Sequence, residues 1–160
     1  MFTGPEIVAT LVDLGITHVV WVPDSAIGPW EEALESWTGL RLIRVCREGE
    51  AWPLAAGLYL GGQLPLVLIQ TTGLFESGDA LRNVRFDLNL PILSIIGVRN
   101  WLVPDSRDSA KKFAEPILQA WGIEHTWIRT PADKPKLAEH FRSCIRVRRP
   151  GMALLAEGPM

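Results

Sequence analysis

The chain has 160 residues and a net charge of −2, with acidic and basic residues interspersed along its length. This length fits one domain of roughly 100 to 200 residues, and the charge balance excludes the strongly basic surface of a nucleic-acid-binding protein. Its two cysteines, Cys46 and Cys144, are far apart and have no CxxC or Cys/His neighbours, so neither a zinc site nor a disulfide framework is expected.

The N-terminal segment predicts a helix. Thr3 is a candidate N-cap, with Pro5 in the first turn and Glu6 at the capping-box position. Apolar residues follow at helical spacing until Gly15. No signal peptide is expected before this helix, and no apolar run approaches the roughly 18 residues of a membrane span. We therefore expect a soluble, cytoplasmic protein that makes no membrane contact.

Apolar runs of strand length then alternate with helical segments to the end of the chain. The predicted strands are 18–22, 40–46, 66–70, 92–96, 125–128 and 152–156. The predicted helices between them are 27–37, 50–60, 75–86, 111–121 and 134–147. This alternation predicts an α/β fold, with a single doubly wound domain over residues 1–160 and a mainly parallel six-stranded sheet with helices on both faces.

Polar residues follow several of the predicted strands, at the edge where open α/β folds bind their ligands. They are Pro23-Asp24-Ser25, Arg47-Glu48-Gly49, Gln70-Thr71-Thr72-Gly73 and Val98-Arg99-Asn100. Together they indicate a ligand-binding edge. Each also has a structural explanation: Asp24 and Ser25 are common in turns, and Thr71 and Thr72 are common helix caps. Gly73 is expected to occupy a backbone position with positive φ.

Glu48 is the first candidate for chemistry, because it is a carboxylate at the point where an apolar run gives way to a helix. The alternative is that it only stabilises the first turn of that helix through the helix dipole. A carboxylate that shares a proton near neutral pH needs partial burial, since desolvation raises its pKa. Trp52 and the apolar residues after Gly49 are candidates for that surrounding, and Glu50 is assigned to the helix surface.

The chain also contains seven tryptophans. Trp21 and Trp121 lie in apolar runs and are expected in the core. Trp52 and Trp101 adjoin the predicted site, so both core packing and contact with a partner chain remain open for them.

Five segments, in chain order, resemble the pyrimidine-binding domain of the thiamine diphosphate-dependent decarboxylases. They are VPDS (22–25), REGEA (47–51) with LAAG (54–57), LVLIQTTGL (66–74), PILSIIGVR (91–99) and WGI (121–123). REGEA is similar to the catalytic glutamate motif of that family, whose glycine corresponds to Gly57. The branches that the chain resembles are phosphonopyruvate decarboxylase and the alpha subunit of sulfopyruvate decarboxylase.

The resemblance implies that residues 1–160 form a pyrimidine-binding domain and that Glu48 activates thiamine diphosphate through a hydrogen bond to its pyrimidine ring. The residues implied to contact the cofactor beside Glu48 are Pro23, Thr71, Thr72 and Gly73. Those implied to contact a small 2-oxo acid substrate are Asp24, Ser25 and Arg99. The activity implied is that of a carboxy-lyase.

The family's diphosphate-binding motif, Gly-Asp-Gly with a downstream Asn, has no counterpart here beyond Ser77-Gly78-Asp79-Ala80-Leu81. The resemblance therefore implies a separate beta subunit that supplies this motif and holds Mg²⁺, no metal ligand in this chain, and activity only as a hetero-oligomer. Glu76 and the acidic stretch 103–108 leave the identity of the 2-oxo acid open. A non-catalytic module that pairs with a thiamine enzyme is the main alternative. A nucleotide-binding domain is a further one, although no GxGxxG or GxxxxGK loop is present.

Overall fold

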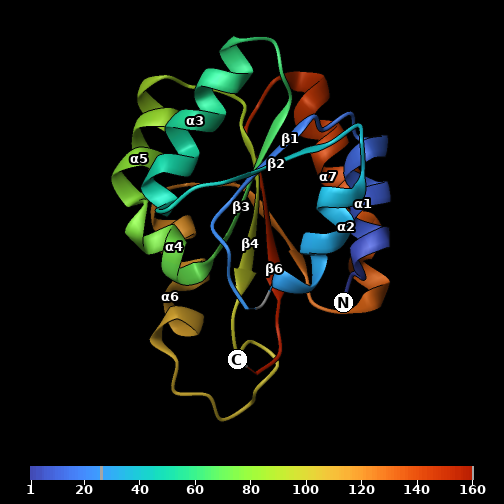
Figure 1. Ribbon diagram of the computed structural model, residues 1–160. Coiled ribbons are helices and arrows are strands. Elements are labelled where there is room, and N and C mark those ends of the chain that lie inside the picture. The colour runs from blue at the N-terminus through green and yellow to red at the C-terminus, as the bar shows by residue number, and fades with distance from the viewer. Residues whose placement is uncertain (26, 160) are drawn as a thin grey trace.

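A computed structural model describes residues 1–25 and 27–159 as a six-stranded sheet covered by helices on both faces (Figure 1). The strands are β1 (His18–Trp21), β2 (Arg41–Arg44), β3 (Pro65–Gln70), β4 (Leu93–Val98), β5 (His125–Ile128) and β6 (Gly151–Ala156). Their order across the sheet is β2-β1-β3-β4-β6-β5, and every pair is parallel. The predicted α/β fold with its parallel sheet is confirmed.

Seven α-helices lie within the described residues. They are α1 (Gly4–Asp13), α2 (Glu31–Ser36), α3 (Glu48–Leu60), α4 (Thr71–Glu76), α5 (Gly78–Arg82), α6 (Ser109–Ala120) and α7 (Lys134–Val147). Helices α1, α2 and α7 cover one face of the sheet, and α3 to α6 cover the other (Figure 1). The chain is therefore doubly wound, with a separate hydrophobic core on each face of the sheet.

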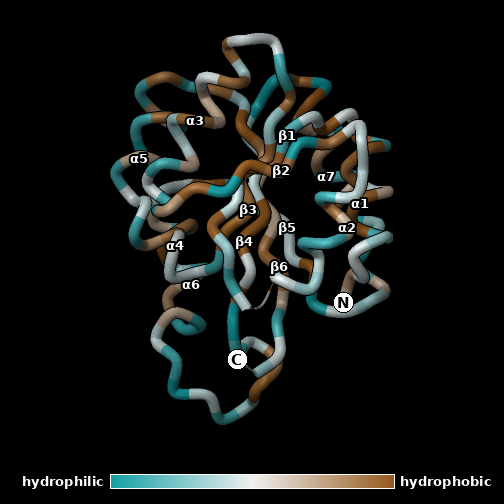
Figure 2. The backbone as a smooth tube through the Cα atoms, in the orientation of Figure 1, coloured by the Kyte–Doolittle hydropathy of each residue, from teal (hydrophilic) through white to brown (hydrophobic). Residues whose placement is uncertain are grey.

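The four inner strands, β1, β3, β4 and β6, are buried along nearly their whole length, as their continuous apolar sequences predict. Successive side chains of a strand enter opposite cores: Leu66 and Leu68 pack with α1, whereas Val67 and Ile69 pack with α3. Figure 2 shows the same concentration of apolar residues along the sheet.

The edge strand β2 is shorter than the predicted strand 40–46. Its partner β1 ends at Trp21, which pairs with Arg44, and one further hydrogen bond joins Val45 N–H to the Trp21 carbonyl (3.0 Å). Beyond that point no neighbouring strand remains to pair with. The guanidinium of Arg44 forms ion pairs with Glu31 and Glu35 of α2, both at 2.5 Å, and places charge on this exposed edge.

The helix predicted at 75–86 begins earlier and is interrupted. Helix α4 starts at Thr71, directly after β3, and ends before Ser77; α5 follows, and then a π-helical turn, η2 (Asn83–Asp87). The Ser77 hydroxyl donates a hydrogen bond to the Gly73 carbonyl (2.7 Å) at this interruption. Serine side chains compete in this way with the regular hydrogen bonds of a helix. The helix predicted at 27–37 likewise divides, into the short 3-10 helix η1 (Gly28–Trp30) and α2.

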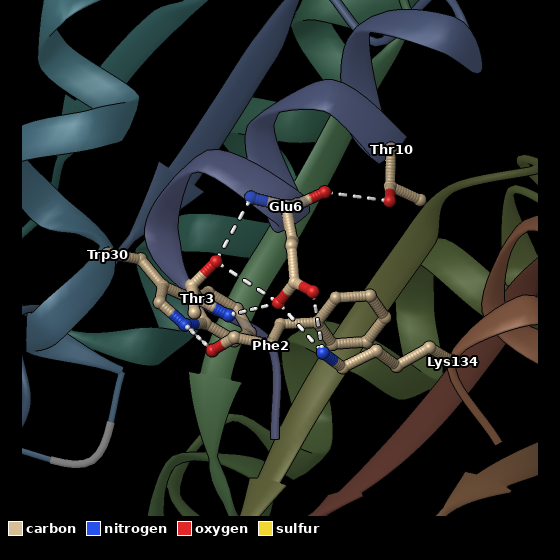
Figure 3. A network of polar contacts seen from close by, with 6 residues as sticks. All are labelled: Phe2, Thr3, Glu6, Thr10, Trp30 and Lys134. Carbon is tan, nitrogen blue, oxygen red and sulfur yellow. Dashed lines mark hydrogen bonds and ion pairs between the residues drawn. The ribbon is translucent and has the colours of Figure 1, made fainter. Parts of the chain in front are cut away.

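The predicted N-cap of α1 is confirmed and forms a capping box with Glu6. The Thr3 hydroxyl accepts a hydrogen bond from Glu6 N–H (3.4 Å), and the Glu6 carboxylate accepts one from Thr3 N–H (2.8 Å) (Figure 3). Lys134 of α7 donates to both oxygens of the same carboxylate, at 2.8 and 2.7 Å. One acidic side chain thus closes the end of α1 and ties it to α7.

Replacing Thr3 by alanine is expected to lower the free energy of unfolding by about 1 kcal/mol, because it leaves N–H groups of the first turn without their cap. Chemical denaturation of the isolated chain measures this change. Thr10→Ala is the matched control, since the Thr10 hydroxyl only bonds to the Glu6 carbonyl within the helix (2.8 Å). Equal destabilisation by both variants would contradict a role for the cap.

No helix in the described part of the chain combines the length and the apolar character needed to cross a membrane.

The strand order of the sheet places a topological switch point between β1 and β3. The chain leaves β1 toward β2 on one side and continues from β3 toward β4 on the other. Open α/β proteins bind ligands outside the carboxyl ends of the strands at such a point.

Candidate functional site

Glu48 is the first residue of α3, and its side chain lies against Gly73 of α4. A Cβ atom on Gly73 would stand 2.5 Å from Oε1 and 2.7 Å from Cδ of Glu48. The expected positive φ at Gly73 is wrong, since the glycines with positive φ in the described chain are Gly15, Gly62 and Gly122. Gly73 is instead required because the carboxyl group of Glu48 occupies the space of its side chain.

A buried hydrogen-bond chain holds Gly73 in this position. The indole N–H of Trp52 donates to the Ser77 hydroxyl (2.9 Å), which donates in turn to the Gly73 carbonyl (2.7 Å). Trp52 and Ser77 are only 2% and 1% exposed. Because Trp52 lies one turn after Glu48 in α3, the chain ties α4 to α3 where Glu48 meets Gly73. Of the two alternatives left open for Trp52, core packing is correct.

Glu76 is the acid whose presence left the identity of the 2-oxo acid open. It forms an ion pair with Arg47. Its carboxylate accepts hydrogen bonds from the Arg47 guanidinium (2.6 and 3.1 Å) and from Gly49 N–H in the first turn of α3 (2.7 Å). Both contacts stabilise the ionised form and lower the pKa of Glu76. Glu50 is exposed, as predicted, and its carboxylate accepts from the N–H groups of Cys46 and Arg47 (3.1 and 3.3 Å).

Two buried polar atoms at the carboxyl end of β3 have no hydrogen-bond partner. They are Oε1 of Gln70, the last residue of β3, and Oγ1 of Thr71, which is fully buried. Buried polar atoms are nearly always paired, so an orphaned pair indicates a position for a ligand or water. Thr71 and Thr72 do not cap a helix, because Gln70 is the N-cap of α4 and both threonines lie in its first turn.

The other predicted site residues are distributed around the same edge. Pro23 and Ser25 are exposed in the connection after β1, and the Asp24 carboxylate accepts hydrogen bonds from Ile27 N–H (2.8 Å) and the Trp21 indole (3.4 Å). Asp24 therefore holds this turn, as its structural explanation predicts.

Arg99 follows β4 and is engaged by a nearly buried acid. Its guanidinium donates to both oxygens of Asp108, at 2.6 and 3.3 Å. The same carboxylate accepts from the Asn100 amide (2.9 Å) and from Ala110 N–H at the start of α6 (2.9 Å). These contacts, led by Arg99, lower the pKa of Asp108. Arg99 thus fixes the connection between β4 and α6.

Glu157 is a residue of this edge that the sequence reasoning missed. It follows β6 directly and is only 9% exposed. Its carboxyl group lies over Gly97 of β4, where an added Cβ would stand 2.8 Å from Cδ and 2.9 Å from Oε2. Oε2 is buried and has no hydrogen-bond partner. Burial, with a smaller contribution from the negative charge of Asp24, raises the pKa of Glu157 to about 8. The sequence feature that could have identified Glu157 is its position as an acidic residue directly after an apolar, buried strand.

A cavity at the opposite edge of the sheet is a weaker candidate. It is lined by residues including Trp52, Ser94, Ile123 and Arg149, and has a volume of about 40 Å³. Sites for metabolite-sized ligands are typically about 300 to 1,000 Å³, whereas one water needs roughly 10 to 15 Å³. The cavity therefore has room for a few water molecules. No cluster of three or more His, Cys, Asp or Glu side chains that could hold a metal ion occurs among residues 1–25 and 27–159.

Sequence comparisons relate the chain to two groups of decarboxylases. Phosphonopyruvate decarboxylase of Streptomyces viridochromogenes is 34% identical over 149 residues, which cover 90% of this chain and 36% of that protein. The sulfopyruvate decarboxylase alpha subunit of Methanococcus maripaludis is 27% identical over 141 residues, covering 86% of this chain and 83% of that subunit. These relatives, at 27–34% identity, support the resemblance to this decarboxylase family.

The resemblance inferred from REGEA and the four other segments is thereby confirmed. A second alpha subunit, from Methanocaldococcus jannaschii, is 26% identical and covers 83% of this chain and 80% of its own length. The chain spans about a third of the first phosphonopyruvate decarboxylase and 24% of a second, from Streptomyces hygroscopicus. The name "subunit alpha" implies a partner subunit in the relatives that carry it. No family model matches the chain.

Proposed function

We propose that the chain is the pyrimidine-binding alpha subunit of a heteromeric, thiamine diphosphate-dependent 2-oxo acid decarboxylase. The observation that carries this proposal is the contact between Glu48 and Gly73 at the carboxyl edge of a doubly wound sheet. The relatives support it, because the chain covers 83% and 80% of two sulfopyruvate decarboxylase alpha subunits.

The residues at this edge fit the pyrimidine half of the cofactor. Glu48 is half-buried against Gly73, so one carboxyl group is held in place and still reachable. The orphaned Thr71 Oγ1, in the first turn of α4, is free to bond to an aminopyrimidine, which offers both donors and acceptors. Among the described residues, none of the acids at this edge forms part of a metal-binding cluster. We therefore propose that the diphosphate and Mg²⁺ are held by a beta subunit with a Gly-Asp-Gly…Asn motif.

Bound thiamine diphosphate supplies the electron sink that makes loss of carbon dioxide from a 2-oxo acid possible. The role we assign to Glu48 is to share a proton with the pyrimidine ring through its carboxyl oxygens. Gly73 keeps those oxygens close to the backbone of α4, and the Trp52–Ser77 hydrogen bonds keep α4 in register with α3. The other proposed cofactor contacts are Pro23, Thr71 and Thr72. The proposed substrate contacts are Asp24, Ser25 and Arg99.

Carbon dioxide release tests the proposal. This chain is co-expressed with a candidate beta subunit that contains the Gly-Asp-Gly…Asn motif. The complex is assayed with thiamine diphosphate, Mg²⁺ and a panel of sulfopyruvate, phosphonopyruvate, pyruvate and longer 2-oxo acids. We expect turnover only when both chains and the cofactor are present. The 2-oxo acid that is turned over most efficiently identifies the substrate. Each chain assayed alone is the control. A stable, cofactor-binding complex without turnover would favour the non-catalytic module instead.

A further inference from the structure

Glu157 is held rigidly at the switch-point edge by its own backbone. Its N–H donates to the Val98 carbonyl (3.2 Å), and its carbonyl accepts from Leu102 N–H (2.9 Å). The next residue, Gly158, accepts a further bond from Asn100 N–H (3.1 Å). The β4–β6 pairing thus continues past the strand end and fixes Glu157 on both sides. The Glu157 side chain is also held in place, because its carboxyl group lies in the space above Gly97 that a larger residue there would fill.

Gln70 faces the same side of the sheet as the Glu157 carboxyl group. Gln70 of β3 pairs with Gly97 of β4, and paired residues of neighbouring strands project to the same face. The carboxyl group of Glu157 occupies that face above Gly97. Gln70 Oε1 and Glu157 Oε2 are both buried and both without a partner. Two unsatisfied polar groups from different strands therefore line one face of the carboxyl edge.

The charged groups around this position leave Glu157 without a cation. From the connection after β1, Asp24 contributes a second negative charge. From the connection after β4, Arg99 is bound to Asp108 by two hydrogen bonds. Glu48 of α3, Arg47 just before it and Glu76 of α4 lie with the helices on the other face of the sheet. A buried carboxyl group beside another acid and with no paired cation in the described chain is stable in its neutral form.

We propose that Glu157 is a further substrate-binding residue, which as a neutral carboxylic acid donates a hydrogen bond to a carboxylate or keto oxygen of the 2-oxo acid. This inference rests on the proposed function for the class of ligand. The neutral acid carries an O–H donor, whereas the ionised group only accepts hydrogen bonds and repels an anionic substrate. Gln70 provides a second polar contact from β3. Glu157 thus makes substrate binding sensitive to pH.

The test compares three proteins within the two-chain complex: wild type, Glu157→Gln and Glu157→Ala. Glutamine keeps the shape and a hydrogen-bond donor but does not ionise. With a pKa of about 8, the neutral fraction of Glu157 falls about tenfold between pH 7 and pH 9. We therefore expect KM for the 2-oxo acid to rise about tenfold over this range in the wild type and to stay level in Glu157→Gln.

At pH 7 we expect Glu157→Ala to raise KM about tenfold or more, the range for a hydrogen bond to a charged group, with kcat changed by less than about threefold. Glu139→Gln, an exposed glutamate of α7, is the matched control and should follow the wild type. The inference is overturned if Glu157→Gln keeps the wild-type pH dependence of KM. It is also overturned if Glu157→Ala leaves KM unchanged.

Failure of the proposed function is distinguishable from failure of this inference. Oxamate, a non-reactive analogue of a 2-oxo acid, is titrated into the same complexes by calorimetry at pH 7 and pH 9. If no 2-oxo acid is turned over, an oxamate affinity that falls about tenfold in the wild type alone would still support Glu157 as an anion-binding acid. Absent binding, or binding that does not depend on pH or on Glu157, would overturn the inference.

Discussion

Replacing Glu48 by glutamine is expected to lower kcat of the proposed two-chain enzyme by about 10²- to 10⁴-fold, the range over which positioned acid–base groups contribute. Glutamine preserves the size of the side chain and its contact with Gly73, but it cannot share a proton with the cofactor. The free energy of unfolding should change little, because Glu48 is only half-buried. Initial rates of carbon dioxide release at saturating substrate measure the effect.

Glu50→Gln is the control for this measurement, because Glu50 is a second acid in the first turn of α3. Its carboxylate accepts hydrogen bonds from the N–H groups of Cys46 and Arg47 and contributes to the helix start. We expect nearly full activity from Glu50→Gln, with a small loss of stability. Equal rates for wild type and Glu48→Gln would support a non-catalytic module and remove Glu48 from the chemistry.

Gly73→Ala is expected to reduce kcat about 10²-fold without unfolding the chain. The new methyl group would meet Oε1 and Cδ of Glu48 at 2.5 and 2.7 Å, which is closer than non-bonded atoms approach. Because those atoms belong to a flexible side chain, Glu48 can move away at little cost to the fold. A displacement of about 1 Å in a reacting group is enough for a loss of this size.

Gly57→Ala is the matched substitution, since Gly57 lies in the same helix as Glu48 and an added Cβ there meets no atom within 4 Å. Alanine in place of glycine in a helix stabilises by up to about 1 kcal/mol, so both variants should remain folded in thermal denaturation. Only Gly73→Ala should lose activity. Full activity in Gly73→Ala would show that the position of Glu48 against α4 does not matter for the reaction.

Local patterns in the sequence were sufficient for the order of elements. The six strands and the start of α1 agree with prediction because apolar periodicity and the Thr3–Glu6 capping box act within a few residues. The boundaries that differ depend on distant partners: β2 ends where β1 ends, and α4 is interrupted at Ser77 beside Trp52 of α3. Such helix and strand boundaries depend on strand pairing and side-chain packing between distant parts of the chain.

For the candidate site, the sequence by itself determined that Glu48 lies between a strand and a helix at the carboxyl edge of a parallel sheet, because that position follows from chain order. The tertiary structure alone decided which residues meet there. Gly73 is small because Glu48 lies on it, and Gly97 is small because Glu157 lies on it. These contacts join residues that are far apart in the chain, so no local pattern encodes them. The raised pKa of Glu157 likewise depends on burial against β4 and on the charge of Asp24 after β1, which come together only when the sheet forms.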